Sequence, residues 1–384
     1  MNLFEVCFLI INVLYIFFNI LLIFGWLRTR SISISHMPQL FISVIIVVRN
    51  EENNIFELLN DLNLQNYDPK LFELIIIDDH SKDETLKIIS TFKKHSNFLI
   101  QVIELKNFIN ENYIDNNFKK KAIEIGVNHA SGEIILNTDG DCRLGPDWIK
   151  TFADYFLTKG AQCVSGPVTF YKEKNIFAKI QTIEFASLIA SGAASLHFGF
   201  PSMCNGANFA YTKQAFLEVD GFAGTANIPS GDDIFLMQKI HSKYPKKVFF
   251  IKNQNAIVQT EAQPNINFFY NQRLRWASKW NMYKDWTISL MAIFVFISNL
   301  TILIFVVGLL FSIINFNLFL NVILLRFAVE ILFLIFVLRF LDKTRLIFLI
   351  PLVQIFYFLY VIYFGLISFF NLSYRWKERK ISSS

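Results

Sequence analysis

Two acidic pairs stand where predicted strands end, and their spacing suits the binding of a cation. Asp139 and Asp141 follow the apolar segment 134–136, and Asp78 and Asp79 follow another such segment. Two carboxylates one residue apart offer the hard oxygen ligands that Mg²⁺ or Mn²⁺ prefers, and a cation held there can also hold a diphosphate. A single Asp at a strand end often only caps a turn, so each motif is weak alone. Together the pairs predict a polar site at one edge of a sheet.

A third acidic pair, Asp232 and Asp233, follows Gly231 and precedes a predicted helix. The ordinary use of a carboxylate at a helix start is to cap free backbone N–H groups. The alternative is a general base that takes a proton from a hydroxyl nucleophile. Asp233 is the candidate base, because Gly231 lets the chain bring it towards the sheet edge that bears Asp139. Asp232 is expected to cap or support.

Gln272, Arg275 and Trp276 lie in an amphipathic segment, 265–286, that leads into an apolar region. Basic and aromatic side chains at such a place are typical of a helix at a membrane surface. They also suit a reaction, since Arg275 can neutralise a leaving diphosphate and Trp276 can stack on a sugar face. The residues alone leave both interpretations open.

The elements that must position these side chains alternate between strands and helices. Apolar runs predict buried parallel strands at 41–48, 74–77, 99–105 and 134–136. The intervening segments predict helices at 53–64, 82–94 and 119–129. This alternation predicts an α/β doubly wound sheet whose ligands bind at the carboxyl ends of its strands. Residues 37–264 have a suitable length for one such domain.

The overall composition places this domain beside a membrane. A chain that is 53% hydrophobic and only 17% charged is not a purely cytosolic enzyme. No charged residue occurs from Val6 to Trp26, so residues 1–27 are predicted to be a retained membrane anchor. Arg28 and Arg30 follow it, and the positive-inside rule places the chain after them in the cytoplasm.

Two classes of partner are not expected. A net charge of +5 without a long basic stripe argues against nucleic acid. The four cysteines have no metal-ligand spacing, so they predict reduced thiols and neither a zinc site nor disulfides.

A second apolar region, 287–372, is predicted to form two or three membrane helices before a basic tail, 373–384. Three crossings would place that tail outside, against the positive-inside rule. One apparent span is therefore expected to be re-entrant or interfacial. The candidates are the helix carrying Arg326 and Glu330 and the one containing Pro351, and the choice between them stays open.

Taken in order, these motifs resemble the inverting family 2 glycosyltransferases. They are most similar to the membrane-bound branch with a Q-x-x-R-W signature, which includes cellulose, hyaluronan, poly-N-acetylglucosamine and glucosylceramide synthases. The resemblance covers roughly residues 40–285, and it rests on segments 43–55, 78–81, 119–141, 205–208, 231–233, 259–261 and 272–276. It implies a GT-A (Rossmann-like) nucleotide-sugar-binding domain on the cytoplasmic face of a multi-pass membrane protein, in a bacterial inner membrane.

The resemblance also implies roles for individual residues. Asp78 and Asp79 would contact the uracil and ribose of a donor, with Arg49 and Glu51 lining the nucleoside. The other implied roles are diphosphate contact for Lys119, nucleotide and Mg²⁺ or Mn²⁺ binding for Asp139 and Asp141, general base for Asp233, support for Asp232, and diphosphate and acceptor binding for Gln272, Arg275 and Trp276.

Two positions depart from the family's pattern. Phe118 stands where a glycine usually precedes the lysine, which leaves the choice among Lys119, Lys120 and Lys121 open. Asp232 replaces a more usual glutamate.

The implied activity is inverting transfer of a sugar from a nucleotide donor, UDP-linked, to a lipid or glycan acceptor at the membrane. One alternative is a polyprenyl-phosphate glycosyltransferase, although those enzymes typically lack the helix with Gln272 and Trp276. The other is a non-catalytic membrane scaffold of the same fold, which would be expected to have lost some of the carboxylates.

Overall fold

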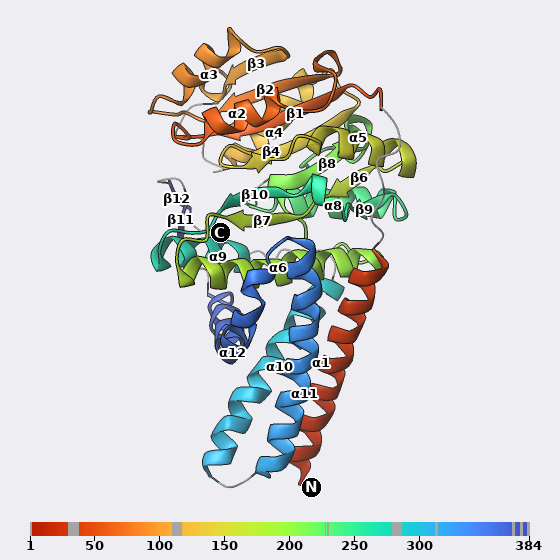
Figure 1. Ribbon diagram of the computed structural model, residues 1–384, viewed down its shortest axis with the longest axis vertical. Helices are drawn as coiled ribbons and strands as arrows, with labels where there is room; N and C mark the ends of the chain where they lie inside the picture. Colours follow the sequence, from red (N-terminus) through yellow and green to blue (C-terminus); the bar gives the residue numbers. More distant parts are fainter. Residues whose placement is uncertain are drawn as a thin grey trace. The chain divides into compact units, whose positions relative to one another are not determined.

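The computed structural model describes residues 2–29, 38–109, 117–226, 228, 230–278, 286–311, 314–370, 373–376 and 379–381. The chain forms two compact units (Figure 1). The sheet unit consists of residues 29–172 and 195–262, and the membrane unit of residues 1–28, 173–194 and 263–384.

Residues 173–194 were expected within the domain 37–264, but they group with the membrane helices. They form most of α6 (Ile176–His197), which packs on α9 (Ile266–Ala277). Phe177 and Phe185 of α6 contact Phe269 and Trp276 of α9 through their rings. These aromatic contacts are the physical reason for the different division.

Seven strands form the main sheet, in the order β3-β2-β1-β4-β8-β6-β9. β1 (Ile42–Val48) pairs in parallel with β2 (Phe72–Asp78) and β4 (Ile134–Asp139), and β3 (Leu99–Glu104) pairs in parallel with β2. Every residue of β2 is buried, which explains why this strand appears in the sequence as a continuous apolar run. The four predicted strands are thus confirmed.

The predicted helices are also present between these strands. They are α2 (Ile55–Asn63), α3 (Thr85–Lys93) and α4 (Phe118–His129). The second half of the sheet is mixed, because β8 (Phe209–Thr212) runs antiparallel to both β4 and β6 (Cys163–Ser165), whereas β9 (Val248–Phe250) is parallel to β6.

A smaller sheet and further helices complete this unit. Three short strands form the smaller sheet, with β10 (Val258–Glu261) between β5 (Arg143–Leu144) and β7 (Val168–Tyr171). The remaining helices are α5 (Trp148–Lys159), α7 (Lys213–Glu218) and α8 (Asp232–Lys243).

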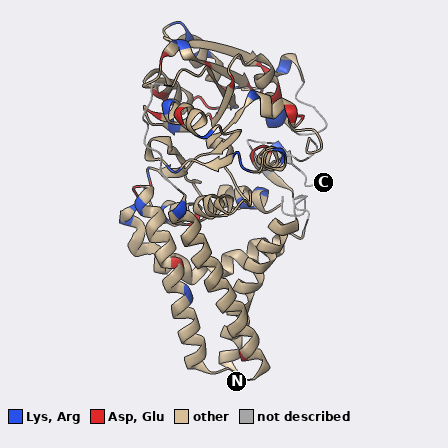
Figure 2. Cartoon of the chain, turned by 90° about the vertical axis from the view of Figure 1, so that its right-hand side faces the viewer, with Lys and Arg blue, Asp and Glu red and all other residues tan. Residues whose placement is uncertain are grey.

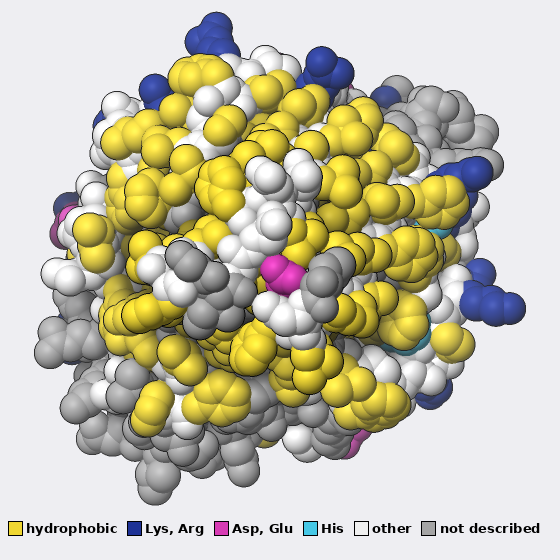
Figure 3. Space-filling model, turned by 90° about the horizontal axis from the view of Figure 1, so that it is seen from below, with side chains coloured by type: hydrophobic (Ala, Val, Ile, Leu, Met, Phe, Trp, Pro, Cys, Tyr) yellow, Lys and Arg dark blue, Asp and Glu magenta, His cyan; other side chains and the backbone are white. Residues whose placement is uncertain are grey.

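Among the described residues of the membrane unit, four helical segments are long and apolar enough to cross a membrane. They are α1 (Leu3–Arg28), α10 (Trp286–Leu310), α11 (Phe316–Phe340) and the segment 344–367, which contains α12 (Ile350–Ile367). Figure 2 shows few charged residues along these helices towards the N-terminus, and Figure 3 shows mainly hydrophobic side chains on the face seen from below. The sequence predicted one apolar anchor and two or three C-terminal apolar helices. By length and composition, the described residues contain one such helix before the sheet unit and three after it.

A buried polar cluster joins three of these helices around Arg326 of α11. Arg326 pairs with Glu330 at 3.2 Å and donates hydrogen bonds to Asn12 of α1 at 3.0 Å and Asn299 of α10 at 2.9 Å. Its guanidinium carbon lies 3.7 Å from the ring centroid of Tyr15. Charged groups inside a membrane segment are costly unless paired, and here one arginine is satisfied by all three helices.

Helix α12 contacts the pair formed by α6 and α9. Before α12, Lys343 forms an ion pair of 2.6 Å with Glu173, three residues before α6. Within α12, the hydroxyl of Tyr360 donates a hydrogen bond of 2.8 Å to Glu184 of α6, and at its end Ile367 packs against Leu274 of α9 and Tyr374. The helix therefore contacts this pair within its length as well as at its end.

The predicted tail and amphipathic helix are described only in part. Within 373–384, β11 (Tyr374–Trp376) pairs antiparallel with β12 (Arg379–Ile381). Within 265–286, α9 ends at Ala277, and residues 279–285 lie outside the described residues.

Candidate active site

The carboxyl ends of β1, β2 and β4 bring the predicted donor-binding residues to one edge of the sheet. In the register of these strands, Val47 of β1 is level with Asp139 of β4, and Val48 is level with Asp78 of β2. Parallel pairing alone therefore places Asp78 and Asp139 on either side of β1. This arrangement agrees with the edge predicted from the sequence.

Asp79 is held by neighbouring polar groups. Arg49 donates a hydrogen bond of 2.8 Å to the carbonyl of Asp79, and its guanidinium lies 3.8 Å from the Asp79 carboxylate. The same carboxylate lies 2.9 Å from Nδ1 of His80. His80 adopts a left-handed backbone conformation, with φ at 58°, which directs the chain away from the strand. Asp79 thus fixes the loop after β2.

Asp78 has a free acceptor. Its Oδ2 accepts a hydrogen bond from the backbone N–H of Ser81 at 3.2 Å, but its buried Oδ1 has no partner among the described residues. Burial raises the pKa of the Asp78 carboxyl above its usual value, and the hydrogen bonds from Ser81 only partly oppose this. A buried oxygen without a partner usually marks a place that a water molecule or a ligand completes.

Glu51 approaches the turn between Asp139 and Asp141. A Cβ atom on Gly140 would lie 3.0 Å from Cγ of Glu51 and 3.1 Å from Cγ1 of Val48. Glu51 is buried and accepts a hydrogen bond of 3.0 Å from the side chain of Asn54. The glycine at position 140 is what allows the loop after β1 to approach the acidic turn so closely.

Lys119 joins two of the acidic pairs. Its ammonium lies 2.8 Å from Oδ1 of Asp139 and 3.7 Å from Oδ2 of Asp232. Burial alone would lower the pKa of Lys119, but the charges of Asp139 and Asp232 outweigh it and raise the pKa above its usual value. Lys119 is therefore a fixed positive charge at the sheet edge.

The two neighbouring lysines have other partners. Lys120 is buried and donates to the carbonyls of Thr225 and Ile228 at 2.6 and 2.8 Å. Lys121 pairs with Glu124 on the same helix at 3.4 Å. Of the three candidates, Lys119 is the one seen in ion pairs with the predicted site, through Asp139 and Asp232.

Asp233 is positioned by backbone amides. Its Oδ2 accepts from the N–H of Gly206 at 2.8 Å, and its Oδ1 accepts from the N–H of Ile234 at 2.8 Å. A Cβ atom on Gly206 would lie 3.6 Å from the Lys119 ammonium and 3.4 Å from Asp232. Gly206 thus borders the same cluster, and its amide is a functional group that residue-type reasoning did not single out. The only sequence signal was the segment 205–208.

Asp141 stands slightly apart from this cluster. Its Oδ2 lies 3.4 Å from the hydroxyl of Thr260 on β10. No group of three or more His, Cys, Asp or Glu side chains in the described ranges is arranged to hold a metal ion by itself. Asp139 and Asp141 nevertheless provide two hard oxygen ligands on one turn, which fits a cation whose other ligands come from a diphosphate and water.

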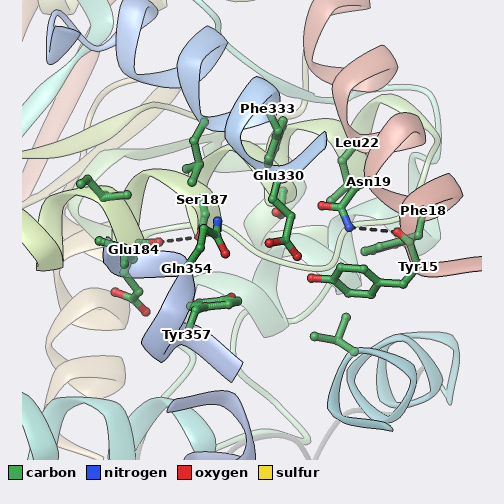
Figure 4. A pocket seen from close by; sticks show the side chains of 15 residues that line it. Tyr15, Phe18, Asn19, Leu22, Glu184, Ser187, Glu330, Phe333, Gln354 and Tyr357 are labelled. Carbon is green, nitrogen blue, oxygen red and sulfur yellow. Dashed lines mark hydrogen bonds between the residues drawn. The ribbon is translucent and has the colours of Figure 1, made fainter. Parts of the chain in front are cut away.

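Gln272, Arg275 and Trp276 lie on α9 in the membrane unit, whereas the carboxylates lie in the sheet unit. These three side chains are partly buried. The same unit contains a cavity of about 90 Å³ between α1, α6, α11 and α12. Figure 4 shows Glu184, Glu330, Gln354 and Tyr357 around this space.

Comparisons with known proteins agree with this geometry. Residues 43–219 match the family described as "Glycosyl transferase family 2", and residues 134–370, more than half of the chain, match "Glycosyl transferase family group 2". Poly-β-1,6-N-acetyl-D-glucosamine synthase of Staphylococcus epidermidis is 27% identical over 252 residues, which are 65% of this chain and 57% of that protein. The Staphylococcus aureus synthase is 26% identical over 244 residues, 62% of this chain and 53% of that protein. The chain thus spans only about half the length of these curated relatives.

A solved structure resembles nearly the whole chain. The mannosyltransferase PcManGT from Pyrobaculum calidifontis, in complex with GDP-Man and Mn²⁺, has a TM-score of 0.57 at 16% identity, and the match covers 92% of this chain and 96% of that one. At that identity the likeness concerns the fold alone, which is of the GT-A type. The family matches, the α/β sheet and the candidate membrane helices lead to one conclusion: this chain belongs to the family 2 glycosyltransferases.

Proposed function

We propose that the protein transfers a sugar, with inversion, from a UDP-linked donor to a lipid or glycan acceptor at the cytoplasmic face of the membrane. The observation that supports this best is the cluster in which Lys119 joins Asp139 to Asp232, beside Asp233. It combines a fixed cation for a diphosphate with a carboxylate for an acceptor hydroxyl. The first donor to test is UDP-N-acetylglucosamine, since the similar staphylococcal proteins are named as poly-N-acetylglucosamine synthases.

The nucleoside would bind at the ends of β1 and β2. The free Oδ1 of Asp78 would accept a hydrogen bond from the uracil, while Asp79, held by Arg49, would face the ribose. Glu51 would line the same loop. Lys119 would then contact the diphosphate and stabilise the charge that develops as it leaves.

Asp139 and Asp141 would hold Mg²⁺ or Mn²⁺. When bound, such a cation supplies positive charge that neutralises the leaving diphosphate. Lys119 already balances Asp139, so the protein supplies one positive charge at this turn by itself. On α9, Arg275 would add another charge for the diphosphate, while Gln272 and Trp276 would bind the acceptor.

Asp233 would take the proton from the acceptor hydroxyl. The two amide hydrogen bonds fix its carboxylate, a group with acceptor positions for several hydrogen bonds. Inverting transfer in one displacement needs such a base on the side of the sugar opposite the diphosphate. Asp232 would support the reaction by holding Lys119.

The test compares Asp233→Asn with Asp232→Asn in the full chain. Asparagine at 233 keeps an acceptor for the Gly206 amide but cannot take a proton. We expect donor affinity near that of the parent and a loss of transfer of about 10² or more. Asp232→Asn is expected to be less harmful to transfer and to weaken donor binding through Lys119.

The measurement uses purified protein in lipid, a panel of labelled nucleotide sugars and extraction of products into organic solvent. Acceptors with and without a terminal lipid phosphate distinguish the proposed activity from a polyprenyl-phosphate transferase. If Asp233→Asn stays active while Asp232→Asn is inactive, the base is Asp232. If no nucleotide sugar is turned over, the proposal fails.

We also propose the orientation of the membrane unit. The basic residues Arg28, Arg339 and Lys343 lie at the helix ends near α6 and α9, whereas segments 1–6 and 311–317 at the opposite ends contain no lysine or arginine. The positive-inside rule then places α6, α9 and the start of the sheet unit in the cytoplasm. Because α12 contacts the α6–α9 pair both at Tyr360 and at Ile367, α1, α10 and α11 would cross the membrane and α12 would not.

A further inference from the structure

Arg273 is a buried charged residue of the segment between Gln272 and Trp276. Its side chain is only 2% exposed, whereas those of Gln272, Arg275 and Trp276 are partly exposed. An arginine is rarely this buried unless its charge is paired. Its partners therefore indicate what the position does.

On its own helix, Arg273 contacts both ends of the signature. Its Nη1 donates a hydrogen bond of 2.5 Å to Oε1 of Gln272. Its guanidinium carbon lies 4.3 Å from the ring centroid of Trp276 and 4.4 Å from that of Phe269. The opposite partner of Trp276 is Phe185 of α6, with ring centroids 5.9 Å apart and planes at 27°. The indole and the carboxamide are thus both fixed by one guanidinium.

On the membrane side, Arg273 is fixed in turn. Its Nη2 forms a buried ion pair with Oε2 of Glu184 on α6. The other carboxylate oxygen, Oε1, accepts a hydrogen bond of 2.8 Å from the hydroxyl of Tyr360 on α12. Glu184 lines the cavity of the membrane unit (Figure 4). Arg273 therefore connects α9 to α6 directly and to α12 through one carboxylate.

This arrangement uses properties that lysine lacks. The flat guanidinium offers separate nitrogens to Gln272 and Glu184 while its face lies over Trp276, and an ammonium is a point charge that cannot do both. Arg326 provides a comparison within the same unit, because it also pairs with a glutamate and lies over a tyrosine ring. Its partners lie on α1, α10 and α11, and none of them belongs to α9.

We propose that Arg273 is a positioning residue for transfer, which holds the side chains of Gln272 and Trp276 in their working orientation and is itself oriented by Glu184 and Tyr360. This inference rests on the proposed function, in which Gln272 and Trp276 bind the acceptor. Arg273 acts through these neighbours and is not assigned a contact with substrate.

The test compares Arg273→Lys and Tyr360→Phe with Arg326→Lys in the full chain in lipid. Arg273→Lys keeps the charge opposite Glu184 and is expected to lower kcat about ten- to hundredfold through loss of orientation. Tyr360→Phe removes one hydrogen bond and is expected to lower kcat less, in the same direction. Both are expected to leave the donor Kd nearly unchanged. Arg326→Lys is expected to lower the thermal midpoint without changing kcat per folded molecule.

A spectroscopic measurement separates this inference from the proposed function. The fluorescence emission of Trp276 is obtained by subtracting the spectrum of a matched protein that also carries Trp276→Phe. We expect this emission to differ from that of the parent in Arg273→Lys and to match it in Arg326→Lys. If Gln272→Ala and Trp276→Ala retain full transfer while Arg273→Lys changes the Trp276 emission, the proposed role of α9 in transfer fails. The contact by which Arg273 positions Trp276 would then still be supported. If Arg273→Lys leaves both kcat and the Trp276 emission unaltered, the positioning role is overturned.

Discussion

Asp78 is buried with one carboxylate oxygen that has no partner among the described residues. Burial raises the pKa of Asp78 above its value in the unfolded chain, so the folded protein holds this proton more tightly. As pH rises through the raised pKa, Asp78 becomes charged in the folded protein, and the free energy of unfolding falls. Asp78→Asn removes this charge. Without nucleotide, we expect the variant to have a thermal midpoint higher by about 2 °C or more at neutral pH.

The pH dependence provides the check for this prediction. The difference between the two midpoints should shrink as pH falls through the raised pKa of Asp78, because the parent then becomes neutral at this position as well. UDP should stabilise the parent more than the variant. A difference that is the same at acidic and neutral pH would contradict the explanation.

The amide of Gly206 gives a second prediction at the residue scale. Gly206 begins the 3₁₀ helix Gly206–Asn208, and proline is tolerated at a first helical position. Gly206→Pro removes the N–H that binds Asp233, and we expect transfer to fall at least about tenfold with donor binding retained. Gly206→Ala keeps the N–H, and the added Cβ would make only ordinary contacts, at 3.4 Å or more. Equal rates for the two variants would show that this amide does not matter.

Residue types predicted the candidate site only up to a point. The acidic pairs and Lys119 could be named because charged residues at strand ends are visible in a sequence. The amide of Gly206 could not, since a backbone group carries no residue-type signal. The sequence could not decide between Lys119 and Lys120 either, because they are the same residue type. They differ in the face of α4 that they occupy, which the structure shows through their partners.

At the scale of the elements, the position of β4 against β1 depends on a glycine in the turn that follows α4. A Cβ atom on Gly132 would lie 2.5 Å from the backbone nitrogen of Ser43 and 2.7 Å from its hydroxyl oxygen. The Ser43 hydroxyl also donates to Glu73 of β2 at 2.6 Å. The turn at Gly132 therefore packs directly on the backbone of Ser43 in β1, and Ser43 is bonded to β2. Separating these backbone atoms to fit a Cβ would disturb both strands.

We expect Gly132→Ala to destabilise the sheet unit by about 1–3 kcal/mol, the usual cost of overpacking. Because β4 carries Asp139, donor affinity should fall together with stability. The matched variant is Gly145→Ala, whose added Cβ would make an ordinary contact of 3.8 Å. Thermal unfolding and donor binding measure the two effects. A stable Gly132→Ala protein would mean that this turn can relax.

The first half of the sheet was predictable because its strands are buried on both faces. The second half was not, because β6 and β9 have only three residues each and offer no period to recognise. The assignment of α6 failed for a related reason. Its apolar residues fit the interior of a domain as well as a helix that packs on α9, and only the contacts with Phe269 and Trp276 distinguish the two.

At the scale of the molecule, the proposed orientation predicts where the termini lie. Single cysteines at Asn2 and Asn317 should react with a membrane-impermeant maleimide on intact cells, because both residues would be outside. A cysteine at Ser373 should react only after the cells are permeabilised, since α12 would not cross. Cys7 and Cys204, which are not buried, are first replaced by serine, whereas the buried Cys142 and Cys163 stay. Labelling of Ser373→Cys on intact cells would mean that α12 crosses.

The polar cluster around Arg326 also has a consequence for how the protein is made. Arg326 and its partner Asn12 are separated by 314 residues. At a synthesis rate of about 5–20 residues per second, α1 resides in the bilayer for roughly 15–60 s before α11 exists. During that time Asn12 and Asn19 can donate to the carbonyls of Phe8 and Tyr15, one turn earlier on their own helix. Arg326 likewise has Glu330 one turn away on α11. Each helix can therefore enter the membrane with its polar groups partly satisfied, and the three-helix cluster forms only when synthesis is almost complete.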